Sequence, residues 1–190
     1  MKAMKYHDYI WDLGGTLLDN YETSTAAFVE TLALYGIRQD HDSVYQALKV
    51  STDFAIETFA PNLEHFLEKY KENEARELEH PILFDGVADL LEDISNQGGR
   101  HFLVSHRNDQ VLEILEKTSI AAYFTEVVTS NSGFKRKPDP ESMIYLREKY
   151  QIDSGLVIGD RPIDIEAGQA AGLATHLFTS IVNLRQVLDM

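Results

Sequence analysis

The chain has 190 residues, 44% of them hydrophobic, which suits one ordinary domain or a core with a small insert and argues against disorder. Its formal net charge of −14 makes nucleic acid and anionic membranes unlikely partners on electrostatic grounds, although the charge can equally serve solubility alone. The absence of cysteine excludes disulfides, thiolate metal sites and cysteine nucleophiles.

The N-terminal segment Met1–Asp8 has two lysines, but no apolar run long enough for a signal peptide follows them. No stretch approaches the ~20 apolar residues that a membrane helix needs. We therefore expect a cytoplasmic protein with no membrane partner, either a monomer or a homodimer. An anionic substrate would need a local positive centre, such as a metal ion or a lysine.

The first predicted element is an apolar strand, Tyr6–Trp11, which leads into Asp12 and a glycine turn. A long helical region, residues 23–76, follows; its first helix has N-cap candidates at residues 23–25 and ends at Gly36. Three further helices are expected there, over residues 42–49, 52–59 and 62–75. The aromatic residues of this region are expected to form its own core: Phe54, Phe59, Phe66 and Tyr70.

After Pro81 the pattern changes to short apolar runs that alternate with helices. Strands are expected over residues 100–104, 126–129, 155–158 and 174–178. Helices are expected over residues 87–96, 109–118, 140–150, 163–171 and 180–189, the last capped by Ser180. This alternation predicts an α/β fold, a Rossmann-like parallel sheet in three α/β/α layers. Residues 1–18 and 82–190 would form the core domain, and residues 19–81 an inserted helical cap.

Polar residues follow three of the predicted strands at the points where the strands end. These residues are Asp12, Ser105 and Asp160, with Asp164 four residues further on. Ligands of parallel α/β sheets bind at the carboxyl ends of the strands, so the residues lie where a site is expected. Polar residues also occur at strand ends for solubility, so each of them alone is weak support.

Each of these residues has a functional and a plain structural interpretation. Asp12 can be a covalent nucleophile beside a tight turn, or an aspartate that caps its own loop. Asp160 and Asp164 can join Asp12 in binding Mg²⁺, or Asp164 can be a first-turn acid favoured by the helix dipole. Lys137 can neutralise a phosphoryl group, or belong to a solvated basic loop. A lone Ser105 could donate its hydroxyl to a phosphoryl oxygen.

Four short motifs, in order and over nearly the whole chain, resemble the haloacid dehalogenase superfamily, in its phosphoglycolate phosphatase-like and β-phosphoglucomutase-like branch with a helical cap. The segment around Phe84-Asp85-Gly86 resembles the hinge where such a cap returns to the core. The motifs are Asp12-Leu13-Gly14-Gly15-Thr16-Leu17-Leu18-Asp19, Phe102-Leu103-Val104-Ser105, Lys137-Pro138-Asp139-Pro140, and Val157-Ile158-Gly159-Asp160 with Asp164.

The resemblance implies a Mg²⁺-dependent phosphatase of a small phosphorylated metabolite, in which Asp12 attacks phosphorus and forms an aspartyl-phosphate. It implies catalytic roles for Asp12, Ser105 and Lys137. The implied magnesium ligands are Asp12, the carbonyl of Gly14, Asp160 and Asp164. The residues expected to contact the phosphate are Gly15, Thr16, Ser105, His106 and Lys137.

One position departs from the family pattern, because Gly14 stands where family phosphatases usually carry an aspartate that protonates the leaving group and later activates water. Such a general acid or base typically contributes ~10²–10⁴-fold to the rate. The protein could act on substrates with good leaving groups, or a cap residue or His106 could supply the proton. His106 could equally be an ordinary, partly exposed histidine at a helix start.

Three other interpretations remain open at this point. A phosphonatase would use a cap lysine as a Schiff base, with Lys49, Lys69 and Lys71 as candidates. A dehalogenase also lacks the second aspartate, but it normally uses no metal, and the Asp160/Asp164 pair argues against it. Finally, a catalytically impaired relative would bind a phosphate ligand or a protein partner and turn over slowly.

Overall fold

The structure is a computed structural model that describes residues 4–190, so Met1–Ala3 of the N-terminal segment lie outside the described residues. The chain divides into two compact units. One is an α/β unit, built from the residues up to Leu18 together with Leu83–Met190, and the other is a helical unit, Asp19–Ile82. Within the described residues, no helix is both long and apolar enough to cross a membrane.

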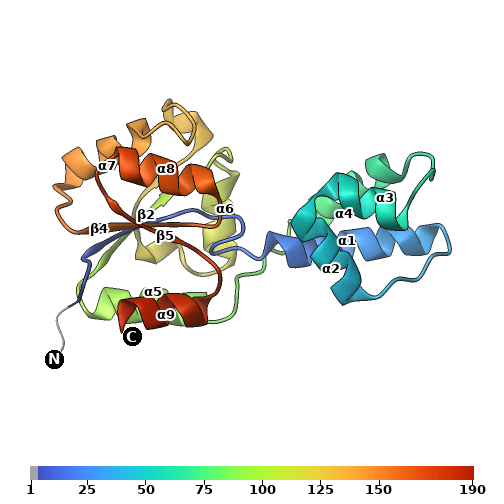
Figure 1. Ribbon diagram of the computed structural model, residues 1–190, viewed down its shortest axis with the longest axis horizontal. Helices are drawn as coiled ribbons and strands as arrows, with labels where there is room; N and C mark the ends of the chain where they lie inside the picture. Colours follow the sequence, from blue (N-terminus) through green and yellow to red (C-terminus); the bar gives the residue numbers. More distant parts are fainter. Residues whose placement is uncertain (1–3) are drawn as a thin grey trace. The chain divides into compact units, whose positions relative to one another are not determined.

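A five-stranded, wholly parallel sheet forms the centre of the α/β unit (Figure 1). The strand order is β3-β2-β1-β4-β5. The prediction of a Rossmann-like parallel sheet is therefore confirmed. The central strand β1 pairs on one side with β2 and on the other with β4, so Trp11 lies opposite both Leu103 and Ile158. The strands are β1 Asp8–Trp11, β2 Arg100–Val104, β3 Phe124–Val128, β4 Gly155–Gly159 and β5 Ala174–Leu177.

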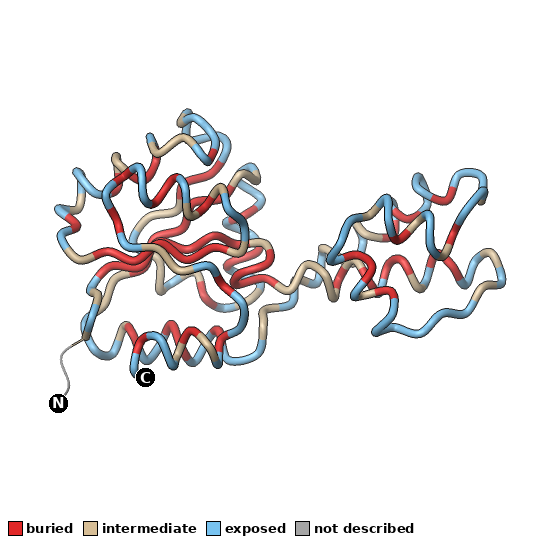
Figure 2. The backbone as a smooth tube through the Cα atoms, viewed as in Figure 1, coloured by how far each residue is buried: buried red, intermediate tan, exposed pale blue. Residues whose placement is uncertain are grey.

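Alternate side chains of the strands enter two separate apolar layers, one on each face of the sheet. Tyr9 and Trp11 of β1 join one layer, and Ile10 between them joins the other. The first layer contains α5 Val87–Asn96, α6 Gln110–Lys117 and α9 Ile181–Leu188, and the second contains α7 Glu141–Tyr150 and α8 Pro162–Ala170. The inner strands β1, β2 and β4 are the most continuously buried part of this unit, as the red stretches of Figure 2 show. Short 3₁₀ turns, η1 Ala121–Tyr123 and η2 Ser130–Ser132, flank β3.

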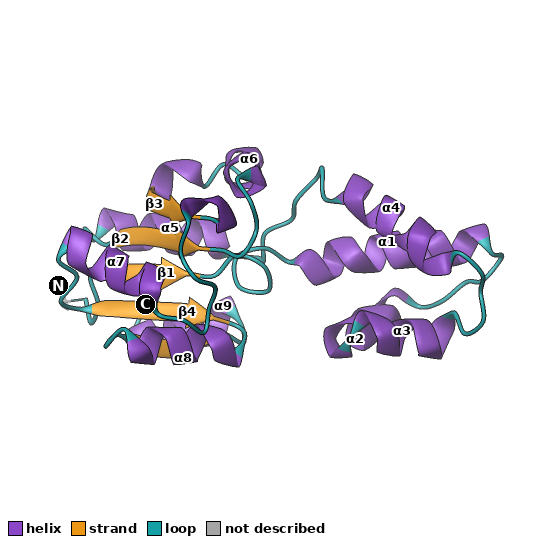
Figure 3. Ribbon diagram, turned by 90° about the horizontal axis from the view of Figure 1, so that it is seen from above, coloured by secondary structure: helices purple, strands orange, loops and turns teal. Residues whose placement is uncertain are grey.

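The helical unit consists of α1 Asn20–Leu34, α2 His41–Val50, α3 Thr52–Phe59 and α4 Phe66–Glu77, and no strand occurs in it (Figure 3). The predicted N-caps at residues 23–25 are wrong, because Asp19 caps α1 by accepting the backbone N–H of Glu22. Phe66 and Tyr70 pack on Phe28 with ring centroids 4.9 and 5.2 Å apart, as a small aromatic core requires. Phe54 departs from the prediction, since it is 45% exposed.

A histidine lies fully buried in the first apolar layer, where it is hydrogen-bonded on both sides. The Nδ1 atom of His101 accepts from Trp11 Nε1 at 3.0 Å, and Nε2 lies 3.0 Å from the carbonyl oxygen of Leu91. A carbonyl can only accept, so Nε2 carries the proton and the ring is neutral. Burial lowers the pKa of His101 to about 4.

This histidine predicts a pH dependence of stability. In the folded chain the pKa of His101 is about 4, below the ~6.5 of an unfolded histidine. Its contribution is therefore complete above ~6.5 and is lost as the pH falls towards the folded value. The His101→Gln variant keeps an acceptor and a donor but does not titrate. Between neutral pH and the folded pKa, we expect wild type to lose on the order of 3 kcal/mol more unfolding free energy than the variant.

Urea denaturation at a series of pH values measures this difference. The comparison isolates His101, because the other titrating groups are common to both proteins. Equal losses in wild type and variant would contradict a neutral, buried His101.

Candidate active site

Three carboxylates, two from the ends of neighbouring strands and one from the helix that follows, meet at the carboxyl edge of the sheet, where the strand order reverses. Asp12 follows β1, Asp160 follows β4, and Asp164 lies in the first turn of α8. The backbone N–H of Asp12 donates to Ile158 O at 2.9 Å, which ties the end of β1 to β4. One ligand atom from each carboxylate lies within 4.8 Å of the others, so the structure brings together three of the residues predicted from the sequence.

Lys137 joins these carboxylates from the loop before α7. Its Nζ atom lies 2.8 Å from Asp12 Oδ1 and 2.6 Å from Asp164 Oδ1, and it also donates to Val104 O at 3.1 Å. The side chain is only 1% exposed, so the interpretation of Lys137 as part of a solvated basic loop does not hold. Lys135, two residues earlier, has a side chain that is 73% exposed and does belong to such a loop.

Two glycines provide the space in which the carboxylates approach the turn. A Cβ atom on Gly15 would lie 2.3 Å from Asp160 Oδ2, and its φ of +81° is a conformation that L side chains rarely adopt. A Cβ atom on Gly159 would lie 2.3 Å from Asp164 Cγ. A larger residue at position 15 or 159 would collide with a carboxylate of the cluster, which explains the glycine at each position.

The electrostatics of the cluster favour the binding of a cation. Burial, followed by the charge of Asp12, raises the pKa of Asp160 to about 6. The same two causes raise the pKa of Asp164, while Lys137 acts in the opposite direction. Carboxylates crowded together in this way repel one another, and each is stabilised as an anion by a positive ion placed among them.

The donor set fits magnesium. Mg²⁺ prefers carboxylate and carbonyl oxygens at ~2.1 Å, so two of its ligands lie at most about 4.2 Å apart. The three carboxylates need to close only slightly from their present separation within 4.8 Å. Asp164 uses both oxygens inside the protein, since Oδ1 accepts from Lys137 and Oδ2 accepts from the Arg161 N–H at 3.1 Å. The contribution of Arg161 was not foreseen, because a backbone donor carries no side-chain signature.

The turn after Asp12 uses its own backbone donors. The N–H of Gly15 donates to Leu18 O at 2.9 Å, and the N–H of Thr16 donates to Leu13 O at 3.3 Å. The hydroxyl of Thr16, which is fully buried, donates to Asp160 Oδ1 at 3.4 Å. In this structure Gly15 and Thr16 therefore hold the turn and Asp160, and their contact with phosphate stays a prediction.

Ser105 and His106 lie at the end of β2, beside the lysine loop. The hydroxyl of Ser105 is buried and accepts the N–H of Arg107 at 3.2 Å. The Nε2 atom of His106 accepts the backbone N–H of Lys137 at 2.9 Å. Burial and the neighbouring positive charges of Lys137, Arg136 and Arg161 lower the pKa of His106 to about 4. At neutral pH its ring is therefore uncharged, which disfavours the hypothesis that His106 is a general acid.

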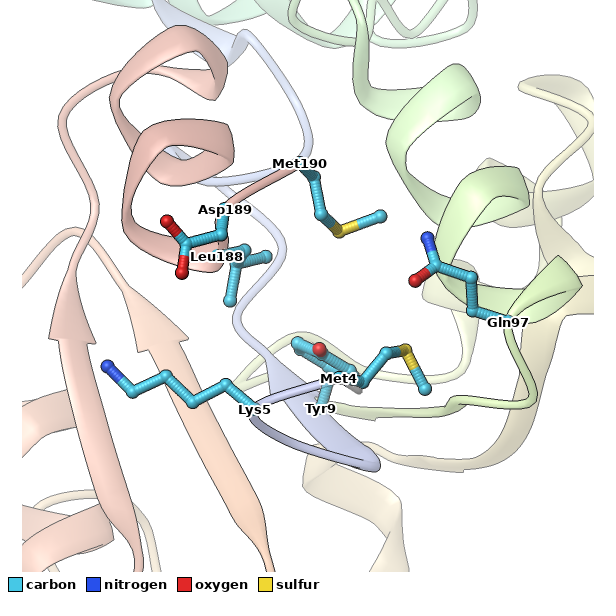
Figure 4. Close-up of a pocket in the computed structure, with 7 residues that line it drawn as sticks. All are labelled: Met4, Lys5, Tyr9, Gln97, Leu188, Asp189 and Met190. Atoms are coloured by element: carbon cyan, nitrogen blue, oxygen red, sulfur yellow. The ribbon is translucent and has the colours of Figure 1, made fainter. Parts of the chain in front are cut away.

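A hollow lies at the opposite edge of the sheet, near the beginning of β1 (Figure 4). Its volume is about 110 Å³, which is small for a metabolite. It has none of the candidate site residues, so it does not compete with the carboxylate cluster. The residues that line it are Met4, Lys5, Tyr9, Gln97, Leu188, Asp189 and Met190.

Comparison with known proteins agrees with this geometry. Residues 9–178 match the model of the haloacid dehalogenase-like hydrolase family, so the chain belongs to that family. It resembles the phosphoglycolate phosphatase of Vibrio parahaemolyticus, with 29% identity over 89% of this chain and 82% of the relative. It also resembles the pyrophosphatase PpaX of Oceanobacillus iheyensis, with 26% identity over 90% of this chain and 83% of the relative.

Solved structures extend the comparison. A crystal structure of a hydrolase from Streptococcus pneumoniae TIGR4 is 94% identical, covers 98% of this chain and 100% of its own, and has a TM-score of 0.96. A haloacid dehalogenase-superfamily hydrolase from Geobacter sulfurreducens, 20% identical over 92% of this chain and 87% of its own, shares the fold with a TM-score of 0.71. The chain is thus an enzyme, a hydrolase of the phosphatase type.

The buried ion pairs predict a large effect of removing the lysine. In the Lys137→Met variant, Asp12 and Asp164 lose their cation while they stay buried. Breaking such a pair by removal of one partner typically costs about 3–5 kcal/mol. We expect a loss of that size in urea denaturation at neutral pH without divalent cations. The matched control is Lys135→Met, which removes an exposed lysine from the same loop and should change stability by less than about 1 kcal/mol.

Proposed function

We propose that the protein is a Mg²⁺-dependent phosphohydrolase that transfers the phosphoryl group of a small phosphorylated metabolite to Asp12 and then to water. The observation that carries this proposal is the convergence of Asp12, Lys137, Asp160 and Asp164 at one edge of the sheet. A merely structural cluster would not need three carboxylates around a buried lysine, because such burial is costly.

Asp12 is the proposed nucleophile. Its carboxylate is held at the end of a buried strand, and Lys137 keeps it beside a positive charge. One Asp12 oxygen attacks phosphorus as the bond to the leaving oxygen breaks, which gives an aspartyl-phosphate. Water then attacks this intermediate, and inorganic phosphate and the free carboxylate result.

Ser105 and Lys137 are the proposed phosphate-binding groups. The ammonium of Lys137 is already oriented and desolvated next to Asp12, so it can offset the charge of the transferring phosphoryl oxygens without reorganisation. The Ser105 hydroxyl accepts one hydrogen bond within the protein and still has its own proton to donate to a phosphoryl oxygen.

Asp12, Asp160, Asp164 and the carbonyl of Gly14 would hold the magnesium ion. When bound, the ion neutralises phosphoryl charge and orients the group for in-line transfer. The raised pKa values of Asp160 and Asp164 support this assignment, because burial and then the charge of Asp12 disfavour their anionic forms, which a bound cation would favour.

The glycine at position 14 supports the proposal that the substrates have leaving groups that need no proton. In the α/β unit, the Lys137 ammonium already donates to Asp12, Asp164 and Val104 O, and the His106 ring is uncharged at neutral pH, so neither is suited to protonate a leaving group. Leaving groups that depart as stable anions, such as the carboxylate of an acyl phosphate, need no proton donor. Alkyl phosphates need such a donor, so we expect them to be poor substrates. We propose that the helical unit is the inserted cap domain.

The phosphonatase alternative finds no support in the candidate lysines. A Schiff-base lysine is normally activated by desolvation or by a neighbouring cation. Lys49 and Lys69 are exposed and lie over the rings of Tyr45 and Tyr35, and Lys71 pairs with Glu74. We therefore propose phosphoryl transfer from oxygen rather than cleavage of a carbon–phosphorus bond.

Hydrolysis of acetyl phosphate and p-nitrophenyl phosphate tests the proposal. Wild type should hydrolyse at least acetyl phosphate with Mg²⁺ and lose this activity in EDTA, and Asp12→Asn should reduce turnover to background because the nucleophile is gone. The control Asp153→Asn removes an exposed carboxylate before β4 and should behave as wild type. If wild type had no Mg²⁺-dependent turnover on either compound, the protein would instead be a phosphate- or partner-binding relative.

Restoring the missing carboxyl group should broaden the substrate range. We expect Gly14→Asp to raise kcat for an alkyl phosphate such as glycerol phosphate by ~10²–10⁴-fold, the usual contribution of a general acid or base. The rate of phosphoryl transfer from acetyl phosphate should change much less, because its leaving group needs no proton. Gly14→Asn is the matched control, because it adds a side chain of the same shape that cannot donate or accept the proton. Equal kinetics of the two variants would contradict the role assigned to this position.

A further inference from the structure

The lysine at the centre of the proposed site is fixed through its backbone by a histidine from another loop. The N–H of Lys137 donates to His106 Nε2 at 2.9 Å. A ring nitrogen accepts a hydrogen bond only when it carries no proton, so the proton of this neutral ring lies on Nδ1. The contact therefore requires one particular tautomer of His106.

The loop that bears His106 is itself attached firmly to the sheet. The N–H of Ser105 donates to Val128 O at 2.9 Å, and Arg107 O accepts the N–H of Ser130 at 2.8 Å. These bonds hold the end of β2 against the segment after β3. The imidazole of His106 extends from this anchored loop to the backbone of Lys137.

The Lys137 side chain is anchored at its Nζ atom, but the remaining bonds of the lysine loop near Lys137 are local. The N–H of Lys135 donates to the exposed Glu141 side chain, and Asp139 N–H donates to Arg136 O within the loop. A cavity of about 20 Å³ adjoins His106 and Lys137, and it is also lined by Ser142, whose buried hydroxyl has no hydrogen-bond partner. Packing beside Lys137 is therefore incomplete, which lets the loop backbone shift slightly once the contact with His106 is lost.

We propose that His106 is a positioning residue that sets the location of the Lys137 ammonium by accepting the Lys137 backbone N–H. This inference rests on the proposed function, in which Lys137 binds the transferring phosphoryl group. It differs from direct phosphate binding by His106 and from proton donation by His106, because the functional atom, Nε2, is directed at the protein backbone. Misplacement of a catalytic group by about 1 Å can cost on the order of a hundredfold in rate.

Nuclear magnetic resonance of the intact chain tests the hydrogen bond without reference to turnover. In protein labelled with ¹⁵N histidine, His106 should show the Nδ1–H tautomer. In protein labelled with ¹⁵N lysine, the Lys137 amide should be protected from hydrogen exchange. His106→Ala should lose this protection, and His106→Gln, whose side-chain oxygen can accept in place of Nε2, should largely restore it. The control His7→Ala removes an exposed histidine from the start of β1 and should leave the Lys137 amide unchanged.

Kinetics with acetyl phosphate and Mg²⁺ test the consequence. We expect kcat to fall about 10- to 100-fold in His106→Ala, with KM changed less than about threefold, and to recover in His106→Gln to within about threefold of wild type. A raised KM, weaker inhibition by inorganic phosphate and unchanged Lys137 protection in His106→Ala would overturn the proposal in favour of direct phosphate binding. Wild-type kinetics in His106→Ala would also overturn it.

The two proposals fail in different ways. If wild type lacks turnover, the proposed function fails, although the resonance data still decide whether the histidine holds the lysine backbone. If wild type is active but His106→Gln is as impaired as His106→Ala with a restored Lys137 amide, the positioning role fails and the proposed function stands.

Discussion

The balance of charge around one buried ammonium group governs the candidate site. Lys137 neutralises part of the charge of Asp12 and Asp164 at distances of 2.8 and 2.6 Å. Three carboxylates and one ammonium still leave two negative charges, which matches the charge of one divalent cation. Asp160 has no lysine partner, and burial together with the charge of Asp12 raises its pKa to about 6. The negative charge that remains at the site therefore has the size that one Mg²⁺ ion can neutralise.

The topology of the sheet makes this concentration of charge possible. Because β1 lies between β2 and β4, the ends of all three strands are neighbours, and segments far apart in the chain converge. Asp12 and Lys137 are separated by 125 positions. Close approach also needs the absence of side chains, and Gly15 and Gly159 supply it next to Asp160 and Asp164. The strand order and the lack of a side chain at the two glycines together allow the three carboxylates to lie close to one another.

Much of the architecture could be predicted because buried parallel strands form continuous apolar runs. The predicted strand over residues 100–104 agrees with β2, and the predicted helix over residues 87–96 agrees with α5. The start of α1 was missed, because Asp19 had been assigned to the preceding motif and its capping bond depends on the backbone conformation.

Contacts between residues far apart in the chain could not be predicted from local sequence patterns. The bond between His106 and Lys137 spans 31 positions, and the one between Trp11 and His101 spans 90. His106 follows a recognisable motif, but nothing in that motif indicates a bond to the Lys137 backbone, and the tautomer of each ring follows from the partner that the fold supplies. The departure at Gly14, by contrast, is visible in the sequence alone, because the motif around it predicts an aspartate at this position. In the proposed function, an aspartate at position 14 would supply a proton donor and would also add a fourth carboxylate to a negatively charged site. In the proposed reaction, the glycine at position 14 therefore makes the enzyme selective for leaving groups that need no proton.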